Sequence, residues 1–128
     1  MKREGEDVTI VATSSMVYVA LEAADLLAQE GVFAEVVDPR TLVPLDRETL
    51  IASAAKTGRV VVVQEAPRTA GFGAEIAAIL AEKAILDLHG PVLRVTGFDV
   101  PYPYWKIEDR YMPSVERVVG ACRRLLEF

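Results

Sequence analysis

Apolar residues along this chain fall into short continuous runs that alternate with longer segments in which they recur every three to four positions. The short runs are rich in β-branched residues and predict strands at 8–13, 33–37, 59–64 and 92–95. The periodic segments predict helices at 16–30, 47–56, 71–86 and 114–126. Because strands and helices alternate, the pattern predicts an α/β fold, a three-layer α/β/α sandwich with a mainly parallel sheet of four to five strands.

Residues at the ends of these segments support the boundaries. Ser14 and Ser15 follow the first strand in the position of a helix N-cap, and Asp46 is placed to cap the second helix. Gly31 and Gly58 stand where the first two helices should stop. The four consecutive valines at 60–63 favour extended structure and predict a central strand buried on both faces.

Length and composition indicate one folded domain. The chain has 128 residues, of which 52% are hydrophobic and 26% charged, which is typical of a single globular core. Residues 1–7 are charged and poor in apolar side chains, so we expect them to form an exposed lead-in, with the domain proper at 8–128.

Charge and hydropathy argue against several classes of partner. The net charge is −5 and the basic residues are dispersed, so the electrostatic attraction that drives nucleic-acid binding is missing. The apolar runs are much shorter than the roughly 20 residues that a membrane-spanning helix needs, and no signal-peptide pattern opens the sequence. We therefore expect a cytoplasmic protein.

The segment after the central strand is the strongest candidate site, because open α/β sheets bind ligands beyond the carboxyl ends of their strands. Glu65 and Arg68 could act there on an anion or a proton, or they could form an ion pair with each other or across an interface. The nearby Gly71-Phe72-Gly73 resembles half of a phosphate-binding fingerprint, but it lacks the third glycine and the P-loop lysine. The alternative is that its glycines allow a tight turn and close backbone approach.

The remaining candidate residues form no recognisable catalytic arrangement. His89 lies in a turn without a sequence-implied partner, so a structural role or a pH-sensitive contact is expected. Cys122 has apolar neighbours and is predicted to be a small buried hydrophobe. The loop at 97–113 concentrates aromatic residues that either cover the protein's own core or form an interface. No catalytic residue, metal cluster or cofactor site is therefore assigned, and the isolated chain is predicted not to be catalytic.

Three motifs in order resemble a known family: DPRTLVPLD at 38–46, EAPRTAGFGAEI at 65–76 and RVTGFDVPYP at 94–103. They are similar to the C-terminal domain of the β subunit of thiamine diphosphate-dependent 2-oxo acid dehydrogenases, a transketolase C-terminal-like domain, over about residues 7–128. The resemblance implies a domain that joins the β subunit to a second β subunit and an α subunit in a heterotetramer. Thiamine diphosphate and Mg²⁺ would then be held elsewhere in the full enzyme, and none by this domain alone.

The family's function implies a role for particular residues. The complete complex would oxidatively decarboxylate a 2-oxo acid, pyruvate or a branched-chain one, and acylate lipoyl groups. The residues assigned to the interface, or to the loop that carries it, are Glu65, Pro67, Arg68, Gly71, Phe72, Gly73 and Glu75. Gln64 departs from the family, where many relatives carry histidine before Glu-Ala-Pro.

Docking to the dihydrolipoyl acyltransferase core is a further implication of the resemblance. It would use the terminal carboxylate, here that of Phe128, and an acidic residue before the fourth strand. That acidic position aligns with His89, and Asp87 lies two residues earlier. The alternative function, from a different class, is a standalone small-ligand or nucleotide-binding regulatory domain.

Overall fold

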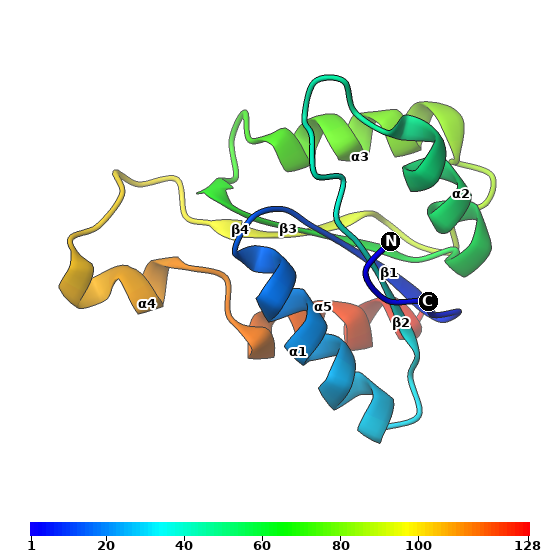
Figure 1. The fold of residues 1–128 in the computed structure, drawn as a ribbon, viewed down its shortest axis with the longest axis horizontal. Coiled ribbons are helices and arrows are strands. Elements are labelled where there is room, and N and C mark those ends of the chain that lie inside the picture. Colours follow the sequence, from blue (N-terminus) through cyan, green and yellow to red (C-terminus); the bar gives the residue numbers. More distant parts are fainter.

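The computed structural model describes residues 1–128 and contains one four-stranded sheet between two layers of helices (Figure 1). All strand pairs are parallel and the spatial order is β2-β1-β3-β4. The elements in chain order are β1 (Val8–Ala12), α1 (Met16–Gln29), β2 (Ala34–Val37), α2 (Arg47–Thr57), β3 (Val60–Pro67), α3 (Phe72–Lys83), β4 (Leu93–Gly97), a 3₁₀ turn (Trp105–Ile107), α4 (Glu108–Tyr111) and α5 (Val115–Leu126). The predicted three-layer α/β/α sandwich is confirmed.

Two apolar cores lie on the two faces of the sheet. Helices α1 and α5 cover one face, where Leu27 and Leu125 are fully buried against alternate residues of β1 and β3 (Figure 1). Helices α2 and α3 cover the other face, where Leu50 and Leu80 pack against the intervening strand residues. Burial on both faces explains why the valines of β3 show no polar alternation.

The carboxyl end of β3 extends further than the sequence pattern predicts. Glu65, Ala66 and Pro67 belong to the strand, so the predicted loop begins only at Arg68. The reason is tertiary, because β4 continues to pair with β3 past an irregularity, from Val63 with Val95 to Pro67 with Gly97. The predicted loop at 97–113 is also partly ordered, since it contains the 3₁₀ turn and α4.

The first seven residues differ from the expected exposed lead-in. Their side chains are mostly exposed, but Arg3 pairs antiparallel with Val36, and Gly5 is buried. The backbone N–H of Lys2 and that of Val36 take part in this pairing. Strand β2 is an edge strand with free backbone groups, and the lead-in binds along that edge.

A buried carboxylate joins this lead-in to the sheet and to α2. Glu35 of β2 is 1% exposed. It accepts hydrogen bonds from the Ser53 hydroxyl at 2.5 Å and the Gly5 N–H at 3.5 Å, and it forms an ion pair with Lys56. Burial raises the pKa of Glu35, but the hydrogen bonds from Lys56, Ser53 and Gly5 and the charge of Lys56 outweigh burial and hold the pKa below its usual value. The charged form is therefore the stable one in the folded protein.

Candidate functional site

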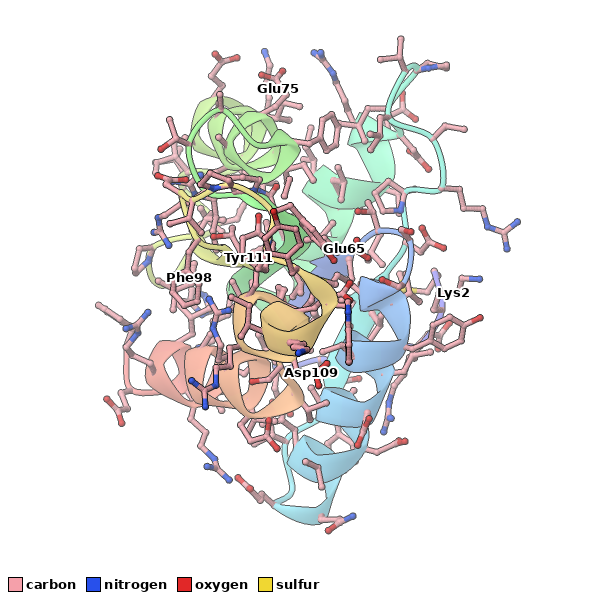
Figure 2. The ribbon with its side chains drawn as sticks, turned by 90° about the vertical axis from the view of Figure 1, so that its left-hand side faces the viewer. Lys2, Glu65, Glu75, Phe98, Asp109 and Tyr111 are labelled. Carbon is pink, nitrogen blue, oxygen red and sulfur yellow. The ribbon has the colours of Figure 1, made fainter.

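The carboxyl end of the sheet gathers the interface residues that the sequence singled out. Figure 2 looks onto this end, with Glu65 and Tyr111 near the centre and Glu75 on α3 above them. Glu65, Pro67 and Arg68 come from the end of β3, whereas Gly71, Gly73 and Glu75 come from the start of α3 and the turn before it. One strand-to-helix connection therefore supplies the whole segment, as expected for a ligand or partner surface of an open α/β sheet.

Gln64 organises this connection from the inside. Its side chain is 6% exposed. Its Oε1 accepts from the Gly73 N–H at 2.5 Å, and its Nε2 donates to the Pro67 carbonyl at 3.0 Å. A single amide thus satisfies a free N–H in the first turn of α3 and a carbonyl at the end of β3. The role of Gln64 in this chain is to hold the turn in shape.

The two glycines are required by this close packing. A Cβ on Gly71 would lie 2.0 Å from Gln64 Nε2 and 2.6 Å from the Pro67 carbonyl oxygen, and a Cβ on Gly73 would lie 2.8 Å from Gln64 Oε1. The first helical turn is therefore filled by protein atoms, which favours the close-approach interpretation of Gly71-Phe72-Gly73 over a phosphate loop.

Glu65 and Arg68 do not pair with each other. Glu65 instead accepts a hydrogen bond from the hydroxyl of Ser15, the residue just before α1. Arg68 donates to the Arg94 carbonyl at 3.2 Å, and Arg94 donates to the Arg68 carbonyl at 3.0 Å. The predicted ion pair is thus wrong within the chain. Ser15 lies at the N-cap as predicted but makes no side-chain cap, because its hydroxyl is directed to Glu65.

A second pair of hydrogen bonds ties the turn after β3 to the loop after β4. The Thr69 N–H donates to Asp99 at 2.8 Å, and the Thr69 hydroxyl donates to the other carboxylate oxygen. The hydroxyl, followed by the N–H, lowers the pKa of Asp99 below its ordinary value. Two of the three family motifs are therefore held together here by a charged carboxylate, a link that no local sequence signal indicates.

Phe72 and Glu75 meet the remaining family motif on the α2 and α3 side. They line a cavity of about 340 Å³ with residues 42–45 and Arg47. Val43 is 91% exposed on its rim. The structure thus brings the DPRTLVPLD and EAPRTAGFGAEI segments side by side although residues 47–64 separate them in the sequence.

The aromatic segment after β4 leaves the body of the domain as an arm, here defined as residues 98–112 (Figure 1). Its base is fixed by Tyr111, which is 4% exposed and stacks edge-on with Tyr102 at 5.1 Å. The Tyr102 hydroxyl donates to Glu108, and this hydrogen bond, with burial, raises the pKa of Tyr102 to about 12. Tyr104 and Trp105, at 88% and 78% exposure, extend away from the core. Of the two interpretations of this segment, the interface is favoured.

The predicted docking residues lie at the opposite end of the sheet. The His89 N–H donates to the Gly58 carbonyl at 2.7 Å, just before β3 begins. A Cβ on Gly90 would lie 3.1 Å from the Phe128 ring, so the C-terminal residue packs beside His89. Asp87, His89 and Phe128 are all exposed, and Phe128 borders a cavity of about 480 Å³. The structure therefore gathers these residues into one corner.

Cys122 is buried, as the sequence predicts. It lies in the core between α5 and α1, with 0% exposure, and burial raises the pKa of its thiol to about 12. A thiol in this state is a poor nucleophile at neutral pH.

The structure contains no cluster of three His, Cys, Asp or Glu side chains that could hold a metal ion. It also contains no helix long and apolar enough to cross a membrane.

Comparison with known families matches this architecture to one of them. Residues 1–118 match the model of the transketolase, C-terminal domain. The chain belongs to the transketolase C-terminal domain family.

Individual relatives are similar to this chain over nearly all of its length. The chain is 48% identical over 126 residues to the pyruvate dehydrogenase E1 component subunit beta of Leifsonia xyli subsp. xyli, covering 98% of this chain and 37% of that protein. It is 46% identical over 128 residues to the same subunit of Bacillus subtilis, covering 100% of this chain and 39% of that protein. The chain thus spans about two fifths of the length of these relatives.

Solved structures agree with the fold. A split gene transketolase, described as an inactive beta4 tetramer, superimposes with a TM-score of 0.84 at 39% identity, covering 98% of this chain and 40% of that one. A 2-oxoglutarate:ferredoxin oxidoreductase from Magnetococcus marinus gives a TM-score of 0.65 at 20% identity over 96% of this chain and 18% of that one, which supports the fold alone.

Proposed function

We propose that this chain is the subunit-assembly and partner-docking domain of a thiamine diphosphate-dependent 2-oxo acid dehydrogenase β subunit. The full complex would decarboxylate a 2-oxo acid, with pyruvate favoured by the named relatives, and acylate lipoyl groups. The observation that carries the proposal is the exposed aromatic arm, in a domain that resembles the β subunits of pyruvate dehydrogenase over its whole length. Exposed aromatic side chains on an ordered segment are typical of an interface.

The residues of this chain do not fit thiamine diphosphate and Mg²⁺. The glycine-rich start of α3, which could have received a diphosphate, is filled by Gln64, and no acidic cluster is available for the metal. We therefore place the cofactor outside this domain, in the remainder of the β subunit and in an α subunit. This chain would support the reaction through assembly.

Replacing the two most exposed aromatic residues of the arm should weaken this assembly. In the complete β subunit co-purified with its α subunit, Tyr104→Ser combined with Trp105→Ser should lower the stability of the heterotetramer at least tenfold, since buried aromatic anchors dominate interface energetics. Sedimentation of the purified complex measures the effect. The control is Leu86→Ser, a 96% exposed residue at the opposite end of the sheet, which should leave the assembly unchanged. Unchanged dissociation of the double variant would refute the assembly role.

Docking to the acyltransferase core is expected to depend on the position of the terminal carboxylate. Deleting Phe128 from the full β subunit should weaken binding to the acyltransferase's peripheral subunit-binding domain about tenfold, because the deletion moves a charge that would pair with a basic group. Phe128→Leu keeps the chain end in place and should bind within about twofold of the unchanged protein. Calorimetry on the three proteins tests this, and equal affinity after the deletion would exclude a docking role for the C-terminus.

The alternative of a standalone nucleotide-binding regulator has less support. Its motif is the Gly71-Phe72-Gly73 turn, where the Gly73 N–H already donates to Gln64. Titration with nucleotides and 2-oxo acids, followed by the amide chemical shifts of residues 71–73, separates the two proposals, because only the regulator should bind a small ligand at this turn.

A further inference from the structure

A basic cavity lies between α5 and the outer strand of the sheet, between the base of the aromatic arm and the Phe128 corner. Its volume is about 270 Å³, and its walls are the β4 residues 93–95 and the α5 residues Arg117, Gly120, Ala121 and Arg124. Arg117, Gly120 and Arg124 follow one another at spacings of three and four residues, so they lie along one face of the helix. The two arginines therefore flank the gap at Gly120.

Neither arginine has a negative partner within the chain. The structure contains four ion pairs, and these use Lys2, Arg3, Lys56 and Arg123 as the cations. The third arginine at the cavity, Arg94, directs its guanidinium to the Arg68 carbonyl and contributes mainly a wall. Two uncompensated positive charges next to one cavity are notable in a protein whose net charge is −5.

Arg117 is held in a defined orientation in this setting. Its Nη2 donates to the Thr96 carbonyl at 2.8 Å, and its guanidinium lies 5.1 Å from the centre of the Phe98 ring. Its Nη1 is buried without an acceptor, and burial lowers the pKa of Arg117 from its ordinary value. Both contacts of this guanidinium, the Thr96 carbonyl and the Phe98 ring, are neutral, so Arg117 lacks the counter-charge that a partly buried cation normally has. An anion in the cavity would supply that charge.

Gly120 keeps the cavity open. A Cβ at this position would have no atom within 4 Å, so no close packing requires glycine. Glycine in a helix interior is less favourable than alanine. Packing therefore does not explain why the position between the two arginines has no side chain. A side chain at this position would lie within one helical turn of both arginines, which are its i−3 and i+4 neighbours on α5.

We propose that this cavity is a binding site for a phosphate-sized dianion, such as the phosphoryl group of a small metabolite. Arg117 supplies a pre-oriented guanidinium, Arg124 supplies an exposed one two helical turns further along α5, and Gly120 leaves room between them. Guanidinium groups bind tetrahedral oxyanions through charge-assisted hydrogen bonds, and two of them balance a charge of −2. The site uses none of the residues assigned to the interface or to docking, although Arg124 also lines the Phe128 cavity and Arg117 contacts Phe98 at the base of the arm.

The test is a titration of the intact chain with inorganic phosphate at constant ionic strength. Binding is measured by calorimetry and by the amide chemical shifts of residues 117–124. We expect saturable binding, and acetate should bind at least tenfold more weakly because it carries a single charge. Arg124→Gln should weaken phosphate binding about tenfold. Gly120→Glu should abolish it, because the new carboxylate would occupy the cavity and pair with the arginines.

Two matched variants keep this test specific. Gly120→Ala adds only a methyl group in open space and should bind phosphate within about twofold of the unchanged protein while raising Tm. Arg110→Gln removes an exposed arginine from α4, outside the cavity, and should also leave binding unchanged. The proposal is overturned if phosphate has no more effect than chloride of equal ionic strength, if acetate binds as tightly, or if the Gly120→Glu chain binds phosphate normally.

Discussion

Replacing Glu35 with alanine is expected to lower the free energy of unfolding by about 3 kcal/mol at pH 7. The variant would leave the Ser53 hydroxyl and the Gly5 N–H without their acceptor, and Lys56 without its counter-charge. These groups belong to a larger polar network, because the Thr9 hydroxyl forms hydrogen bonds with the hydroxyls of Ser53 and Thr57 at 2.8 Å each. The loss of a partner inside a connected network costs more than the loss of an exposed contact. Urea unfolding followed by circular dichroism measures the difference.

The stabilisation of the folded state by Glu35 should depend on pH in a defined direction. Because the folded pKa of Glu35 lies below its ordinary value of 4.5, the charged carboxylate stabilises the folded state fully above that value. The contribution should decline as the pH falls below about 4.5 and disappear as the pH passes through the lower folded pKa. The difference between the unchanged protein and Glu35→Gln should therefore shrink on acidification.

An exposed ion pair provides the control for this prediction. Glu30 pairs with Arg123 on the surface, where solvent screening reduces the value of such a contact, so Glu30→Ala should change the unfolding midpoint far less than Glu35→Ala. If both substitutions have the same effect, or if the Glu35 effect is constant from pH 7 to pH 3, the network does not stabilise the fold in the way described.

Gly97→Ala is the second substitution with a large expected effect, a loss of about 2 kcal/mol in the free energy of unfolding. A Cβ at this position would lie 2.5 Å from the Glu65 carbonyl oxygen and 2.6 Å from the Tyr111 ring. The carbonyl belongs to the paired end of β3, so it has little freedom to move, and the buried Tyr111 ring must shift. The arm should then separate from the sheet.

Limited proteolysis tests this consequence directly. Cleavage within residues 98–112 should accelerate in Gly97→Ala before global unfolding, since the base of the arm loses its contact. Gly120→Ala is the matched control, because its Cβ would meet nothing, and it should cleave no faster than the unchanged protein. Equal cleavage rates and an unchanged midpoint for Gly97→Ala would mean that the close approach at Gly97 does not limit the position of Tyr111.

The alternation of elements was predictable from the sequence because each strand carries a short β-branched run and each helix its own periodicity. The valines of β3 and the stop at Gly58 are local signals, and the structure confirms both, with Gly58 in the left-handed conformation. The end of β3 at Pro67 was not predictable, since its pairing partner Gly97 lies thirty residues further along the chain. The pairing of Arg3 with Val36 was not predictable for the same reason, because the edge of β2 that it uses lies more than thirty residues further along the chain.

The candidate site was predictable in location but not in its contacts. The position of Glu65 at the carboxyl end of a central strand follows from the fold class, and the two glycines correctly indicated close backbone approach. The partner of Glu65 is Ser15, fifty residues earlier, and a local sequence signal for Ser15 favoured a helix cap instead. The sequence suggests an ion pair of Arg68 with Glu65, its nearest acidic residue, whereas in the structure Arg68 donates to the Arg94 carbonyl.

The rigid sheet has a consequence for the order of events at its two ends. The aromatic arm and the Phe128 corner are separated by the length of β3. A partner bound at one end would thus not overlap a partner bound at the other. We therefore expect one domain to hold two partners at the same time, bound in either order.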